Sequence, residues 1–124
     1  MLCLTISIPN FTHILQRKEN AVILQGGYMV NKQQDSRTDS FFDAILTLKT
    51  REECYVFFDD ICTVNEISSM AQRFEVARML LDGCVYAEIA EKTGASTATV
   101  SRVKRCLTYG SGGYKLGAER LETK

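Results

Sequence analysis

The side chains most able to do chemistry lie in the C-terminal third of the chain. Arg102, Lys104 and Arg105 follow a run of alanine, serine and threonine residues, and every charged residue from Ser96 to Leu116 is basic. Guanidinium and ammonium groups bind phosphate, and an arginine can also donate two hydrogen bonds to the edge of a guanine base. This group of residues therefore indicates binding to nucleic acid.

Catalytic and metal-binding chemistry has few candidates. His13 is the only histidine, and the five cysteines are odd in number and form no C-x-x-C pair; they are Cys3, Cys54, Cys62, Cys84 and Cys106. Such cysteines are typical of reduced thiols in a cytoplasmic protein. Neither a zinc site nor a histidine-dependent triad is easy to assemble from them, so we expect no enzyme, no metal and no cofactor.

Length and charge restrict the class further. The 124 residues, 45% of them apolar, suit one globular domain. The formal net charge is +0, so binding to nucleic acid has to depend on local charge asymmetry rather than on overall charge. The chain has neither a signal peptide pattern nor the run of roughly 18 apolar residues that a membrane span needs.

The basic residues have to be positioned by the stretch from Tyr86 to Arg105, whose spacing predicts a helix-turn-helix. A glycine provides the positive φ of the turn, a small residue stands four positions before it where the helices cross, and apolar residues recur at the buried positions. The expected scaffold residues are Ile89, Ala90, Gly94, Val100 and Val103.

The helical period then fixes which residues of the second helix point outward. Thr97 and Ala98 could contact bases or a thymine methyl, and Arg102 or Arg105 could contact guanine, whereas Ser96 and Lys104 are better placed for phosphate. The expected DNA-binding residues are Ser96, Thr97, Ala98, Ser101, Arg102, Lys104 and Arg105. A helix-turn-helix can also serve only as a protein-docking element, so an adaptor without specific DNA binding is the alternative.

Three further helices are expected before this unit. Asp39 or Ser40 is the expected cap of the first, and the pairs Thr50 with Glu53 and Thr63 with Glu66 have the spacing of capping boxes. Gly83 suits a left-handed cap at the end of the third helix. No strand pattern interrupts residues 40–107, so the predicted fold class is all-α, with at most a short helix near Lys115 to Leu121.

The N-terminal residues 1–38 are expected to be a flexible arm ahead of a domain at 39–124. Alternation at Leu2, Leu4, Ile6 and Ile8 could form a short strand, whereas residues 30–39 are polar. Gln25-Gly26-Gly27 can be encoded by a bacterial ribosome-binding sequence just before Met29, so residues 1–28 are either translated upstream sequence or a native arm. The codons at residues 25–27 test this hypothesis.

Two segments carry a family resemblance. One runs from Arg73 to Gly83 and ends in Leu80-Leu81-Asp82-Gly83, and the other contains Gly94-Ala-Ser-Thr-Ala-Thr99. From about Phe41 to Leu121 the chain resembles the Trp repressor superfamily, in particular its TrpR-like YerC/YecD branch. The resemblance implies an all-helical, intertwined homodimer that binds double-stranded DNA. The dimer core that it implies contains Phe41, Phe42, Tyr55, Phe57 and Phe58.

The same resemblance implies a possible effector pocket made by Arg73, Arg102, Val103 and Cys106. In the Trp repressor, two arginines enclose the indole, and Arg73 and Arg102 match them. Glycine follows the second arginine there, whereas Val103 does so here, and a ligand-binding serine is replaced by Cys106. Added bulk and a weak thiol donor both disfavour tryptophan, so we expect no effect of tryptophan, which calorimetry can test. The effector, if one exists, stays unknown. The sequence thus predicts a cytoplasmic, homodimeric, sequence-specific transcriptional regulator, most simply a repressor.

Overall fold

The computed structural model describes residues 21–24, 28–31 and 35–123. From Ser36 onward the described residues form helices, so the predicted all-α class is confirmed for the domain. In chain order the elements are β1 (Ala21–Leu24), β2 (Tyr28–Asn31), α1 (Ser36–Thr47), α2 (Arg51–Ile61), α3 (Val64–Leu81), α4 (Tyr86–Thr93), α5 (Thr97–Tyr109) and α6 (Gly113–Glu122).

The two strands form an antiparallel hairpin ahead of the helical domain. Ala21 lies opposite Asn31, and Leu24 lies opposite Tyr28. This hairpin falls within the stretch for which we predicted a flexible arm. Met29, the hypothetical start residue, lies in β2, while the strand expected between Leu2 and Ile8 lies outside the described residues. The domain boundary at residue 39 and the origin of residues 1–28 stay predictions.

Helix α1 begins earlier than the sequence indicated. The expected caps Asp39 and Ser40 are wrong, because both lie inside the helix and Asp35 is the N-cap. The backbone N–H of Thr38 donates to Oδ1 of Asp35 at 2.7 Å, and hydrogen bonds from Thr38 lower the pKa of this carboxyl. The first turn carries no large apolar residue, which is why hydrophobic periodicity placed the start too late.

The next two helices begin at their predicted caps. Thr50 and Thr63 each accept a hydrogen bond from the backbone N–H three residues later. At Thr63 the capping box is complete, and hydrogen bonds from the Thr63 backbone N–H and hydroxyl lower the pKa of Glu66. At Thr50 the expected box is only half formed, because the Glu53 carboxylate accepts from the backbone N–H of Lys49 instead.

Gly83 ends α3 as predicted. It has a φ of 82°, its N–H donates to the Leu80 carbonyl, and the Cys84 N–H reaches back to the Met79 carbonyl at 3.0 Å. This pair of bonds is a Schellman motif. It reverses the chain direction, and α4 begins three residues later at Tyr86.

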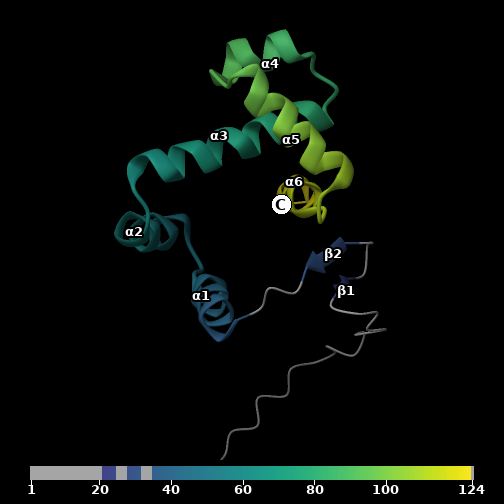
Figure 1. Ribbon diagram of the computed structural model, residues 1–124. Coiled ribbons are helices and arrows are strands. Elements are labelled where there is room, and N and C mark those ends of the chain that lie inside the picture. The colour runs from purple at the N-terminus through teal and green to yellow at the C-terminus, as the bar shows by residue number, and fades with distance from the viewer. Residues whose placement is uncertain (1–20, 25–27, 32–34, 124) are drawn as a thin grey trace, which may run out of the picture.

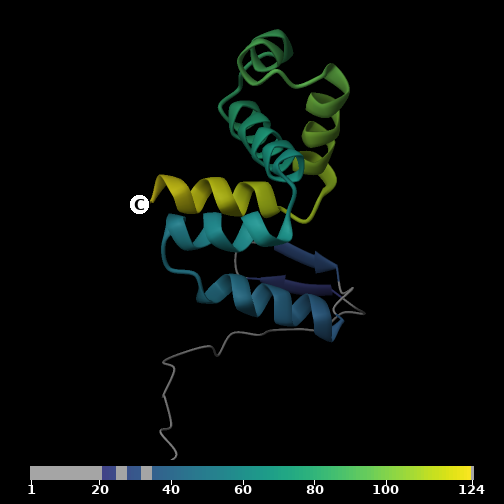
Figure 2. The ribbon, with the colours of Figure 1, turned by 90° about the vertical axis from the view of Figure 1, so that its left-hand side faces the viewer.

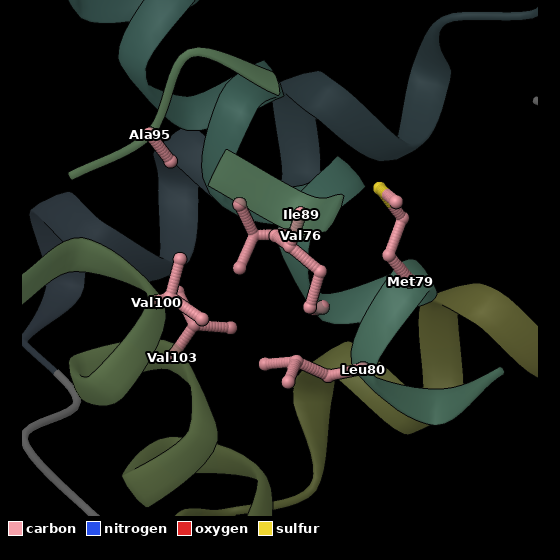
Figure 3. Close-up of a cluster of buried hydrophobic side chains, with 8 residues drawn as sticks. Val76, Met79, Leu80, Ile89, Ala95, Val100 and Val103 are labelled. Atoms are coloured by element: carbon pink, nitrogen blue, oxygen red, sulfur yellow. The ribbon is translucent and has the colours of Figure 1, made fainter. Parts of the chain in front are cut away.

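The core lies where α3 is crossed by α4 and α5, and α6 also packs on α3. Figure 3 shows the side chains converging between these helices. The buried residues of this core are Val76, Ala77, Met79, Leu80, Ile89, Ala95, Val100 and Val103. Cys84, Leu107 and Tyr114 pack against them from the edge. The expected scaffold residues Ile89, Val100 and Val103 are thus among the most buried side chains of the domain.

The rest of the domain extends away from this core. In Figures 1 and 2, α4 and α5 lie around the C-terminal end of α3, whereas α2 and α1 lie at its N-terminal end. Neither α1 nor α2 contains a buried residue. Helix α6 begins at Gly113 and is longer than predicted, because Tyr114 packs against the core and Ala118 is buried. No helix within the described residues is long and apolar enough to cross a membrane.

Candidate DNA-binding site

Helices α4 and α5 meet at the predicted turn. Gly94 has a φ of 68° and caps α4 by donating its N–H to the Ala90 carbonyl at 2.9 Å. Ala95 follows with only 4% of its surface exposed, so the chain crosses the core before it enters α5 at Thr97. The glycine is needed here because a side chain is strained at positive φ. The helix-turn-helix geometry is thus present as the spacing predicted.

Helix α5 divides cleanly into a buried and an exposed face. Val100 and Val103 are 0% and 1% exposed, and Leu107 continues the same side one turn later. All seven residues that we expect to bind DNA are exposed: Ser96, Thr97, Ala98, Ser101, Arg102, Lys104 and Arg105. Since the valines pack on α3 and α4, the polar and basic face has to point outward. Whether these residues contact DNA stays a prediction.

Ser96 has a structural task that the sequence interpretation missed. Its hydroxyl oxygen accepts the backbone N–H of Thr99 at 3.1 Å and lies 3.0 Å from the Thr99 hydroxyl, which makes Ser96 the N-cap of α5. The first turn of α5 holds no acidic residue. The positive end of the helix dipole therefore adds to the arginine and lysine charges that follow.

The positive charge of this unit comes from α5 rather than from α4. On α4, the Lys92 ammonium donates to the Glu88 carboxylate at 2.7 Å, and this hydrogen bond, with the charge of Glu88, raises the pKa of Lys92. Ion pairs within residues 35–123 include those of Arg37 with Asp35, Arg78 with Glu75 and Lys92 with Glu88. The cations of α5 take no part in them.

A second missed feature fixes the turn itself. The Thr93 hydroxyl donates to the Ile89 carbonyl at 2.6 Å and accepts the Ala95 N–H at 3.2 Å. From α3, Nε2 of Gln72 donates to the Thr93 carbonyl at 3.0 Å. Gln72 precedes Thr93 by 21 residues, so no local sequence pattern could have signalled this contact.

The possible effector residues are not gathered around one hollow. Arg73 lines a groove of about 430 Å³ with Cys62, Asn65, Glu66, Ser69 and Met70, and its Nε donates to the Ser69 carbonyl. Arg102, Val103 and Cys106 do not line that groove. Val103 is buried in the core and Cys106 is exposed on α5.

The residues expected in a dimer core lie at the other end of the domain. The Phe41 and Phe57 rings stack with centroids 6.0 Å apart, whereas Phe42 and Tyr55 are 53% and 68% exposed. Tyr55 and Phe58 also line an apolar groove of about 580 Å³ between α2 and α3. Among the residues that the structure describes, no group of three or more His, Cys, Asp or Glu side chains is arranged to hold a metal ion.

Comparison with known proteins gives a consistent result. The model of the Trp repressor protein family matches residues 36–122. The uncharacterized protein YerC of Bacillus subtilis (strain 168) is 55% identical over 93 residues, which are 75% of this chain and 89% of YerC.

Two crystal structures are similar to this chain. One is a candidate Trp repressor from Staphylococcus aureus, 53% identical with a TM-score of 0.71, covering 75% of this chain and 93% of that one. The other is a TrpR-like protein from Eubacterium eligens, 55% identical with a TM-score of 0.71, covering 75% and 96%.

The hydroxyl of Thr93 allows a direct test of the turn. Thr93→Val keeps the size of the side chain but leaves the nearly buried Ala95 N–H without its acceptor. We expect the free energy of unfolding in urea to fall by about 1 to 3 kcal/mol, the usual cost of such an unpaired group. Thr93→Ser retains the hydroxyl and is the control; equal losses in both variants would contradict the assignment.

Proposed function

The chain belongs to the Trp repressor protein family, and on that premise we propose that it regulates transcription by binding DNA as a homodimer in the cytoplasm. The observation that carries the proposal is the exposed surface of α5, where Arg102 and Arg105 lie opposite the buried Val100 and Val103 and Lys104 is exposed beside them. A helix whose apolar face is packed in the core and whose outer face is basic is suited to binding in the major groove. Repression is the simplest outcome, because a protein bound across a promoter excludes polymerase.

Local charge supports this reading despite the neutral chain. The formal net charge is +0, yet α5 carries three cations and no acid, whereas Glu52, Glu53, Asp59 and Asp60 lie on α2 at the other end of α3. A protein with this distribution presents its positive end to the phosphates and keeps its negative end away from them. Phosphate contacts of this kind make the affinity fall steeply with salt.

A second copy would complete the apolar packing of α1 and α2. Leu46 and Val56 are 81% and 69% exposed in the single chain, and the apolar groove between α2 and α3 is open. Burial of apolar side chains contributes about 1.5 to 3 kcal/mol each, so these helices gain stability only when another surface covers them. A dimer joined here would present two α5 helices to half-sites about 34 to 36 Å apart, one helical turn of DNA.

Regulation by tryptophan is not part of the proposal. Val103 fills core space beside Ile89 and Val100, and Cys106 offers only a weak thiol donor. We therefore propose that DNA binding does not depend on tryptophan.

Substitution of Arg102 tests specific recognition. A DNA duplex selected from a random pool by the wild-type protein serves as the operator, and a scrambled duplex serves as non-specific DNA. Arg102→Ala should weaken operator binding by about 1 to 3 kcal/mol, the scale of one bidentate base contact, and leave non-specific binding much less affected. Fluorescence anisotropy at several salt concentrations measures both.

Lys104→Ala is the matched variant on the same helix. If Lys104 contacts a phosphate, Lys104→Ala should weaken binding to both duplexes equally. It should also reduce the slope of log affinity against log salt concentration by about 1. If Arg102→Ala weakened binding to both duplexes equally, Arg102 would be a phosphate contact and not a base contact. No binding by the wild-type protein at low salt would favour the adaptor function instead.

The dimer has its own test. At micromolar concentration the wild-type protein should sediment at twice the chain mass, and Leu46→Lys should shift it to the monomer, because the charge would enter the covered surface. Tyr109→Lys is the control, since Tyr109 is 83% exposed at the end of α5. A wild-type monomer, or a dimer that tolerates Leu46→Lys, would contradict the proposed interface.

A further inference from the structure

One side-chain hydrogen bond joins the helix-turn-helix to the rest of the domain over a long sequence distance. Nε2 of Gln72, on α3, donates to the Thr93 carbonyl at 3.0 Å across 21 residues, and the bond is partly buried. Other side-chain bonds of the domain, such as Lys92 to Glu88 and Ser40 to the Ser36 carbonyl, span four residues. They stabilise single helices, whereas the Gln72 bond fixes one element relative to another.

The acceptor is a carbonyl that its own helix cannot satisfy. Thr93 is the last residue of α4, and the final carbonyls of a helix have no intrahelical N–H partner. The carboxamide of Gln72 also lies beside the turn, since a Cβ on Gly94 would come within 3.9 Å of Nε2. Gln72 therefore caps α4 from outside, at the residue where the chain turns toward α5.

Apolar packing fixes which face of α5 is buried, but it restrains the angle at which α4 and α5 cross α3 less than a hydrogen bond does. The core between α3, α4 and α5 is made largely of small side chains, including Val76, Ala77, Ala95, Val100 and Val103, and hydrophobic contacts are non-directional. Helix α4 has only eight residues, and Val85 gives it no side-chain cap at its start. A hydrogen bond, by contrast, weakens steeply when its angle or length changes.

We propose that Gln72 is a positioning residue that sets the orientation of the α4–Gly94–α5 unit relative to α3. This inference rests on the proposed DNA-binding function and adds to it what sets the distance between the two DNA half-sites. Helix α3 leads from the end of the domain where we place the dimer interface to the end that carries α5. Rotation at the Thr93 carbonyl would therefore change the separation of the two α5 helices in the dimer, without altering any residue that faces DNA.

Gln72→Met tests this role, because methionine keeps the side-chain length but has no N–H donor. The probes are the operator selected by the wild-type protein and the same duplex with one base pair inserted between its half-sites. For the wild-type protein the insertion should weaken binding strongly. In Gln72→Met we expect binding to the selected operator to weaken about 2- to 10-fold, the range for one net hydrogen bond. The ratio of the affinity for the selected operator to the affinity for the lengthened duplex should fall by at least the same factor.

Ser68→Ala, at an exposed position on the same helix, is the matched control and should keep the wild-type ratio. A loss that is equal on both duplexes would mean that Gln72 contributes only stability, and an unchanged ratio with unchanged affinity would mean that the bond is dispensable. Either result overturns the inference.

Amide hydrogen exchange separates this inference from the proposed function. In Gln72→Met, amides of α4 and of the turn should exchange faster while the amides at Val76 and Ala77 in α3 keep their protection. If the wild-type protein selects no DNA, the DNA-binding function fails, yet localised exchange would still support the orienting role of Gln72. Exchange that rises equally in α3 and α4, or in neither, would overturn it.

Discussion

The structure depends on the crossing of three helices around one shared apolar core. Val76 on α3, Ile89 on α4 and Val100 on α5 are all 0% exposed, so each of the three helices contributes a fully buried side chain to one shared core. Once these residues are buried, the rotation of α5 about its own axis is fixed. The outward position of Arg102 and Arg105 is therefore a consequence of packing on the opposite side, and no contact of the basic residues themselves is needed to produce it.

Burial is distributed unequally along α3. Its C-terminal half holds Val76, Ala77, Met79 and Leu80 in the core, whereas α1 and α2, at its N-terminal end, bury nothing fully. A domain of this size stabilises itself through one core, and an exposed apolar surface of this extent typically marks an interaction site. The C-terminal end of α3 thus packs within the chain and orients α5. The apolar surface at its N-terminal end is covered by a second chain in the proposed dimer.

The features that depend on residues close together in the chain could be predicted from the sequence. Gly94, Ala90 and the valines of α5 lie within one short unit, so their spacing was sufficient to predict the turn and the buried face. The caps Thr63 and Gly83 are equally local. The late start assigned to α1 has a different cause, because its first turn is polar and its cap, Asp35, lies before any hydrophobic period. The bond from Gln72 to Thr93 was invisible for a third reason, since it joins residues 21 positions apart whose side chains have no shared period.

The exposed face of α5 can change without disturbing the buried face. Thr97, Ala98 and Ser101 are exposed and are not part of the core cluster, so their substitution leaves the packing of α5 intact. Surface changes away from caps and cores usually alter stability by less than about 0.5 kcal/mol. Ser96 is the exception on this face, because its hydroxyl caps α5. If α5 binds DNA as proposed, a relative with the same valines and glycine but different residues at 97, 98 and 101 should therefore keep the position of α5 and bind a different DNA sequence.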